Sequence, residues 1–224
     1  QLEMILDMDK VELRRNSEWF DKLGAIELAR LAQNFTVAQM IERENFAQRL
    51  KEQKPISLHE FLYPVFQGYD SVEVEADVEI GGTDQLFNMM AGRVMQKALG
   101  QAPQQVLTFD LLTGSDGRKM STSWGNTIYI TDTPADMYGK LMRINDELIA
   151  QYYRICTDVS EETIEQVVAD IGAGANPRDT KASLAREVVR LYHGDIAAEE
   201  AEQIFERLFR DGSGPSEDDF KEVS

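Results

Sequence analysis

The stretch 72–112 constrains the fold more than any other part of the sequence, because its pattern changes from strand to helix and back. Apolar residues alternate with acidic ones from Val72 to Ile80, which by period alone predicts a strand. A helical apolar stripe follows and ends at Gly100, and Val106 to Leu112 is a second short apolar run. Strand, helix and strand form the crossover unit of a parallel sheet, so the sequence predicts an α/β fold.

The first part of the chain is predicted to be mainly helical. A short buried strand is expected around Met4 to Leu6, followed by a helix over 17–35 with apolar residues at helical spacing. Capping-box pairs predict further helix starts at Thr36 and Ser57. Pro64 lies inside the second of these helices and should bend its axis, because it clashes with a preceding carbonyl.

The last part of the chain is predicted to be purely helical, with starts at Thr133, Ser160 and Asn176. The change from a mixed to a helical pattern near residue 130 predicts two domains, 1–129 and 130–224. Within the first, 1–56 is a helical segment and 57–129 carries the candidate site.

The charge balance limits what the surface can bind. The chain has 23 Lys and Arg against 40 Asp and Glu, a formal net charge of −17. Such a surface repels a phosphate backbone at long range. If the intact protein binds RNA, most of the contact must come from a local patch or from sequence outside this chain. Four cations on one predicted helix, Arg178, Lys181, Arg186 and Arg190, form either such a patch or, more typically, a solvated face.

The sequence also bears on cellular location and completeness. No apolar run approaches the roughly 20 residues of a membrane span. The single cysteine, Cys156, excludes an internal disulfide and fits a reducing compartment such as the cytoplasm. Because the sequence begins at Gln1 and ends in a polar acidic stretch, we expect it to be part of a longer protein.

Three segments carry side chains suited to chemistry. The loop from Asp116 to Ser123 reads DGRKMSTS, and its cations and hydroxyls suit a polyphosphate, although such loops are more often plain surface. The turn from Gly81 to Gln85 joins a strand to a helix start, which is either a nucleotide site or a simple turn. Tyr63, Gln67 and Asp70 share one helix face, which by itself is typical of an ordinary polar face.

Taken together, these segments resemble the tyrosyl-tRNA synthetases of bacterial type, which are class I aminoacyl-tRNA synthetases. The string Lys119-Met120-Ser121-Thr122-Ser123 is similar to the KMSKS signature, and Gly81-Gly82-Thr83-Asp84-Gln85 with Asn88 and Gly92 looks like the tyrosine-specific pattern. The resemblance covers nearly the whole chain in the correct order. It implies the second half of a Rossmann-like parallel-sheet catalytic domain followed by an all-helical domain, and it implies that the helix bearing Asp70 continues, leaving only about 77–81 as strand.

The resemblance also implies roles for individual residues. Lys119, Ser121 and Thr122 would act catalytically on the phosphates, with Thr122 in place of the second lysine. The residues expected at ATP are Gly82, Asp84, Leu111, Leu112 and Lys119. Those expected at tyrosine are Tyr63 and Gln67 for the ammonium group, Asp70 for the hydroxyl group, and Gln85 near the carboxylate. Glu79 departs from the pattern, since many members carry glutamine there; its carboxylate either adds charge near the site or faces solvent.

The function implied is a tyrosine–tRNA ligase that uses ATP and Mg²⁺, with tyrosine and tRNA-Tyr as substrates and a homodimer as its assembly. The helices within 1–56 resemble the family's dimer-forming insertion. The family's HIGH motif and anticodon-binding domain are absent from this sequence, so we expect the chain alone to have little activity. A tryptophanyl-tRNA synthetase and a non-catalytic module for dimerisation or binding remain alternatives, the first disfavoured by Asp70 and the Gly-Gly-Thr-Asp-Gln string.

Overall fold

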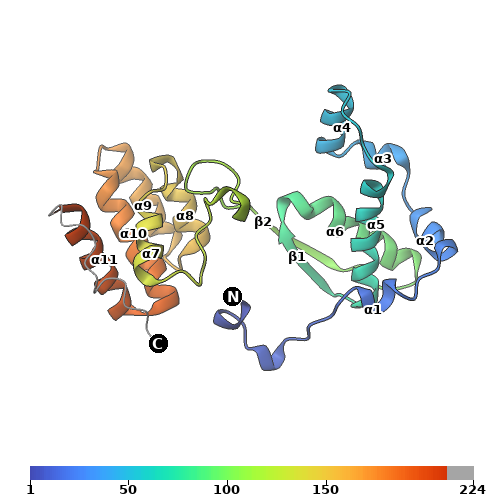
Figure 1. Cartoon of the computed structure of the whole chain (residues 1–224), viewed down its shortest axis with the longest axis horizontal. Helices are drawn as coiled ribbons and strands as arrows, with labels where there is room; N and C mark the ends of the chain where they lie inside the picture. The colour runs from blue at the N-terminus through green and yellow to red at the C-terminus, as the bar shows by residue number, and fades with distance from the viewer. Residues whose placement is uncertain (211–224) are drawn as a thin grey trace. The chain divides into compact units, whose positions relative to one another are not determined.

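The structure is a computed structural model that describes residues 1–210. Its helices and strands (Figure 1) are α1 (Ser17–Phe20), α2 (Ala25–Ala32), α3 (Val37–Ile41), α4 (Glu44–Lys51), α5 (Leu58–Glu73), β1 (Val78–Gly82), α6 (Leu86–Ala98), β2 (Gln105–Phe109), α7 (Pro134–Leu141), α8 (Ile149–Cys156), α9 (Glu161–Gly172), α10 (Pro177–His193) and α11 (Asp195–Arg210). Short 3₁₀ helices are η1 (Leu2–Met4), η2 (Met8–Lys10), η3 (Thr83–Gln85), η4 (Thr122–Trp124) and η5 (Asp146–Leu148). The chain divides into two compact units, Glu12–Leu111 and Gln1–Val11 with Leu112 onward.

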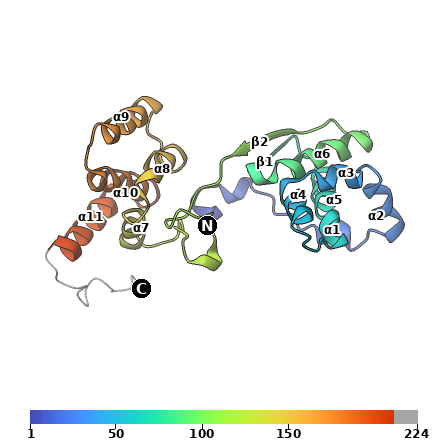
Figure 2. The same cartoon turned by 90° about the horizontal axis from the view of Figure 1, so that it is seen from above.

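A parallel pair of strands organises the unit Glu12–Leu111. Val78 of β1 pairs with Gln105 of β2, and the register continues to Gly82 and Phe109. Helix α6 connects the two strands and contacts both of them (Figure 2). This is the crossover unit that the sequence predicted, and the α/β fold class is confirmed.

The boundary between α5 and β1 corrects one prediction. Val72 and Glu73 still belong to α5, and the strand begins only at Val78. The strand predicted from Val72 by alternation alone is therefore wrong over 72–77, whereas the short strand implied by the family resemblance is confirmed. Tertiary packing decides the outcome, because Val72 is buried in a cluster with Val65 of the same helix and Met95 of α6.

Two glycines allow α5 and α6 to pack closely. A Cβ added to Gly68 would lie 3.0 Å from the backbone carbon of Ala91. A Cβ added to Gly92 would lie 2.4 Å from Ser71 Oγ and 2.6 Å from Gln104 Nε2. Neither position has room for a side chain, and the helices lie side by side in both views (Figures 1 and 2). This packing fixes the α5 face that carries the predicted tyrosine-binding residues.

The N-terminal elements differ from their predictions in two places. The segment expected as a strand around Met4 to Leu6 begins as the 3₁₀ helix η1, so that prediction is wrong. The helix expected over 17–35 is divided into α1 and α2, with Gly24 as the N-cap of α2. The capping boxes at Thr36 and Ser57 are confirmed.

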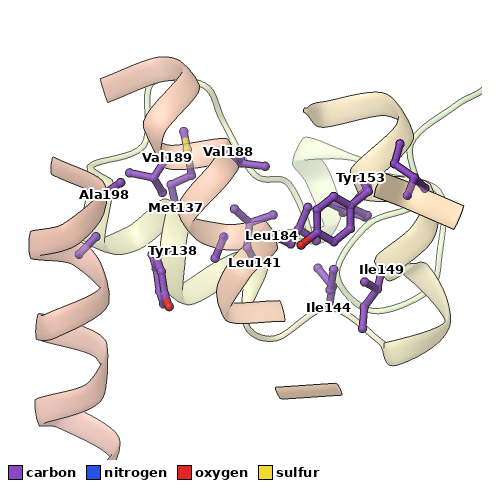
Figure 3. Close-up of a cluster of buried hydrophobic side chains, with 14 residues drawn as sticks. Met137, Tyr138, Leu141, Ile144, Ile149, Tyr153, Leu184, Val188, Val189 and Ala198 are labelled. Carbon is purple, nitrogen blue, oxygen red and sulfur yellow. The ribbon is translucent and has the colours of Figure 1, made fainter. Parts of the chain in front are cut away.

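Helices α7 to α11 surround a shared apolar core (Figure 3). Met137, Tyr138, Leu141, Leu184 and Val189 are all almost completely buried there. Side-chain caps at the three predicted starts, Thr133, Ser160 and Asn176, are confirmed. The proposed division into domains 1–129 and 130–224 stays a prediction. No helix in the described residues is both long enough and apolar enough to span a membrane.

Candidate active site

Helix α5 presents the three predicted tyrosine-binding residues on one face. Tyr63 is 57% exposed, whereas Gln67 and Asp70 are half-buried. Their spacing of four and three residues places them on successive turns of the same helix. The face therefore combines an exposed phenol, an amide and a partly desolvated carboxylate.

Asp70 is held by side chains from the start of α1. Trp19 Nε1 donates a 2.8 Å hydrogen bond to Asp70 Oδ1, and Asn16 also donates to this carboxylate. Burial raises the pKa of Asp70, and the nearby negative charge of Glu79 acts in the same direction, while the two hydrogen bonds oppose the shift. The carboxylate is thus a positioned acceptor in a poorly hydrated setting.

Sequence reasoning assigned Asn16 and Trp19 only to the dimer-forming insertion and missed their place at the site. A signal was present, because an indole N–H that is buried normally finds an acceptor. Trp19 is buried, and Asp70 is that acceptor, 51 residues away in the chain.

Glu79 faces inward and does not face solvent. Its Oε1 accepts a 3.0 Å hydrogen bond from Gln67 Nε2, and its Oε2 accepts one of 2.9 Å from Ser71 Oγ. Gln104 Nε2 also donates to Oε2. The question that the sequence left open is therefore answered: the carboxylate of Glu79 lies directly behind one of the predicted tyrosine-binding residues.

The turn after β1 gathers three of the predicted ATP-binding residues. A Cβ added to Gly82 would lie 2.7 Å from both Asp84 Oδ1 and Leu111 Cδ2, so these three residues meet at one point. Gln85 ends η3, and its Oε1 accepts a 3.0 Å hydrogen bond from the buried Asn88. The amide group of Gln85 is thereby oriented, with its N–H₂ group available to an anion such as a carboxylate or phosphate.

The predicted phosphate loop belongs to the other unit and has a defined conformation. Asn126, only 4% exposed, accepts from Ser121 N at 2.8 Å and donates to Asp116 Oδ1 at 2.8 Å and to Lys119 O at 3.2 Å. Arg118 also binds Asp116, and its guanidinium lies over the ring of Trp124. Hydrogen bonds from Asn126 and Arg118 lower the pKa of Asp116 to about 2.

The two cations of the loop are adjacent. Arg118 pairs with Asp116, and Lys119 follows it on an exposed backbone segment bridged to Thr113. Ser121 Oγ lies 2.8 Å from Ser123 Oγ, and Thr122 is exposed at the start of η4. Leu112 belongs to this same unit and packs against its apolar core.

The predicted cationic surface on α10 is largely neutralised by carboxylates. Lys181 pairs with Asp146 at 2.5 Å, Arg186 with Glu202 at 3.8 Å, and Arg190 with Asp158 at 2.9 Å. These ion pairs therefore favour the interpretation of this surface as an ordinary solvated helix face over its interpretation as a phosphate-binding patch. Within residues 1–210, no three His, Cys, Asp or Glu side chains gather into a metal-binding group.

Comparisons with known proteins agree with this geometry. A family model described as tRNA synthetases class I (W and Y) matches residues 1–210. The tyrosine–tRNA ligase of Bordetella avium is 50% identical over 225 residues, which is 100% of this chain and 54% of that protein. That of Haemophilus influenzae is 47% identical over 218 residues, 97% of this chain and 54% of that protein. The chain thus spans about half the length of the curated relatives it matches.

Solved structures show the same fold. A tyrosyl-tRNA synthetase complexed with L-tyrosine from Archaeoglobus fulgidus aligns with a TM-score of 0.64 at 21% identity, covering 90% of this chain and 70% of that one. A mitochondrial tyrosyl-tRNA synthetase of Aspergillus nidulans aligns with a TM-score of 0.61 at 22% identity, covering 87% of this chain and 57% of that one. With the family model matched from residue 1 to residue 210, the chain belongs to the class I tRNA synthetases of the W and Y group.

Proposed function

We propose that the protein containing this chain is a tyrosine–tRNA ligase, which activates tyrosine with ATP and transfers it to tRNA-Tyr. The observation that carries the proposal is the setting of Asp70. This partly desolvated carboxylate shares a face of α5 with Tyr63 and Gln67, and it accepts a hydrogen bond from Trp19. A carboxylate that accepts hydrogen bonds at the end of a pocket favours a substrate with a hydroxyl group there, because a hydrocarbon would leave it unpaired.

The proposed reaction follows from the groups present. The tyrosine carboxylate oxygen attacks the α-phosphorus of ATP, the bond to the bridging oxygen breaks, and pyrophosphate leaves. Gln85 orients the attacking carboxylate, Gly82 and Asp84 hold the ribose, and Leu111 and Leu112 border the adenine. Lys119 stabilises the charge that develops on the leaving phosphates, with Ser121 and Thr122 as hydrogen-bond donors. Transfer to the terminal ribose of the tRNA then needs no covalent enzyme intermediate.

The proposed ligase also needs Mg²⁺ and tRNA, and the charges of this chain indicate how each would be bound. Since the described residues offer no metal-binding cluster, Mg²⁺ would accompany ATP through the phosphate oxygens. The net charge of −17 and the paired cations of α10 give this chain little attraction for an RNA backbone. We therefore assign most of the tRNA contact to sequence that the longer relatives carry beyond the matched half.

The same reasoning predicts little activation activity for residues 1–224 alone. One face of the two-stranded sheet carries exposed apolar side chains, Val78, Ile80, Leu107 and Phe109. Parallel sheets are normally covered on both faces. A hybrid ligase, in which residues 1–224 replace the matched 225 residues of the Bordetella avium enzyme, supplies the remaining sequence.

The test of the proposed function is pyrophosphate exchange by this hybrid ligase. We expect exchange with tyrosine, none with tryptophan, and little with either amino acid for residues 1–224 alone. Exchange with tryptophan would identify the W branch of the family instead. A folded hybrid that exchanges with neither amino acid, beside an active parent enzyme, would favour a non-catalytic module.

We further propose that this chain forms a homodimer through the apolar surface of α2 to α5. Leu58 at the start of α5 is 79% exposed, and Ile26 and Val37 are similarly exposed in the same unit. Such a group of exposed apolar side chains is typical of an interface.

Replacing Leu58 by glutamate is expected to weaken self-association by at least about tenfold, because an unpaired carboxylate would be buried in the interface. Analytical sedimentation of residues 1–224 over a concentration series measures the dissociation constant of self-association. Ile196→Glu is the matched control, since Ile196 is 76% exposed but lies in the other unit. A monomeric parent chain, or an equal effect of both substitutions, would contradict the proposed interface.

A further inference from the structure

Glu79 is the centre of a hydrogen-bond network behind the α5 face. It accepts hydrogen bonds from Gln67 Nε2, Ser71 Oγ and Gln104 Nε2. We propose that Glu79 is a positioning residue that fixes the orientation of the Gln67 amide and thereby makes the site selective for an α-ammonium group. This inference rests on the proposed function, because it concerns how the amino group of tyrosine is recognised.

The direction of the Gln67 amide follows from the chemistry of its partner. An ionised carboxylate only accepts hydrogen bonds, so the N–H₂ group of Gln67 must be the one that faces Glu79. The carbonyl oxygen of the same amide is then turned away from Glu79. No group in the described part of the chain donates to Gln67 Oε1, which leaves this acceptor for a cationic ligand group.

Glu79 is itself held firmly from the opposite side. Gln104 is almost fully buried, and it donates to Met89 O at 3.1 Å while its backbone N–H donates to Gln96 Oε1 at 2.8 Å. A Cβ added to Gly92 would collide with Gln104 Nε2 and Ser71 Oγ, so these donors are tightly packed. The carboxylate therefore has little freedom to leave Gln67.

A neutral amide at position 79 would behave differently. Glutamine can accept or donate at that point, so Gln67 could present either its oxygen or its N–H₂ group to the ligand. An N–H₂ group directed at an ammonium group would be repulsive. Glu79 thus removes the unfavourable orientation, in addition to supplying a negative charge.

The ligand-free test uses the full 224-residue chain labelled with ¹⁵N. The side-chain amide signal of Gln67, identified by its loss in Gln67→Ala, is expected to shift in Glu79→Gln because its hydrogen-bond partner is changed. Asp77→Asn is the control, since it removes an exposed negative charge two residues away. A Gln67 signal that does not respond to Glu79→Gln, or that responds equally to Asp77→Asn, would overturn the inference.

The ligand test compares L-tyrosine with 3-(4-hydroxyphenyl)propanoate, which lacks the amino group. Glu79→Gln is expected to weaken L-tyrosine binding about fivefold, the scale of one lost hydrogen bond, and to leave the deaminated compound unchanged. In the Gln67→Ala background, Glu79→Gln should have a clearly smaller effect, because only the loss of the negative charge remains. An equal effect with and without Gln67 would show that charge alone acts, and equal weakening of both ligands would show a general structural role; either overturns the inference.

The experiments distinguish a failure of the role proposed for Glu79 from a failure of the proposed function. If the parent chain binds neither compound, tyrosine recognition by this chain is contradicted, while the ligand-free amide signal still decides whether Glu79 orients Gln67. If the parent chain binds L-tyrosine and Glu79→Gln binds it equally well, the role of Glu79 is wrong and the proposed function stands. Thermal unfolding of each variant shows whether the fold is retained.

Discussion

Replacing Lys119 by alanine is expected to slow tyrosine-dependent pyrophosphate exchange by the hybrid ligase by about 100- to 1,000-fold. Arg118 is neutralised by Asp116 and lies over Trp124, so it cannot substitute for the lost ammonium group. Thr122 offers a hydroxyl group but no charge. We therefore expect the proposed stabilisation of the leaving pyrophosphate to depend on Lys119.

The kinetic constants separate this role from a structural one. Because the developing charge exists only in the transition state, kcat should fall while the KM for tyrosine stays nearly constant. Lys51→Ala, which removes an exposed lysine on α4, is the matched control. Thr122→Lys, which restores a second cation, should raise kcat by up to about tenfold. Unchanged kcat in Lys119→Ala would contradict the assignment of this loop.

Local signals in the sequence were sufficient for much of the fold. Each of the capping residues Thr36, Ser57, Thr133 and Ser160 lies within a few positions of the backbone group it binds, so the helix starts could be predicted correctly. The α5 to β1 boundary could not be predicted from period, because Glu73 and Glu75 alternate with valines in either conformation. Burial of Val72 against Met95, which the sequence does not reveal, decides between them.

The parts of the candidate site formed by residues close together in the sequence could be predicted. The contacts between residues remote in the sequence could not. The spacing of Tyr63, Gln67 and Asp70 gave their common face, because helical geometry is regular. The partner of Asp70 is Trp19, which is remote in the sequence. The role of Glu79 depends on Gln104, which comes from the segment before β2. Such long-range pairs follow from tertiary packing, so local sequence patterns do not identify which two residues pair.

Replacing Asp70 by alanine is expected to lower kcat/KM for tyrosine in the hybrid ligase by about 10- to 150-fold, which corresponds to one lost hydrogen bond to a charged acceptor. Activity with phenylalanine should fall less, because phenylalanine never paired with this carboxylate. The ratio of the two specificity constants measures the effect. Asp21→Ala, which removes an exposed carboxylate next to α1, is the control.

The pH dependence gives a second and independent measurement of Asp70. Burial raises the pKa of this carboxylate above its ordinary value of 3.8, and hydrogen bonding to the phenol is strongest with the ionised form. Tyrosine binding should therefore weaken as the pH falls through the raised pKa, beginning at a higher pH than an exposed aspartate would show. In Asp70→Ala, tyrosine binding should no longer weaken over this acidic pH range. Phenylalanine binding should lack this pH dependence in both the parent enzyme and the variant. If the affinities for tyrosine and phenylalanine fall together as the pH is lowered, and Asp70→Ala leaves both pH profiles unchanged, Asp70 does not bind the hydroxyl group of tyrosine.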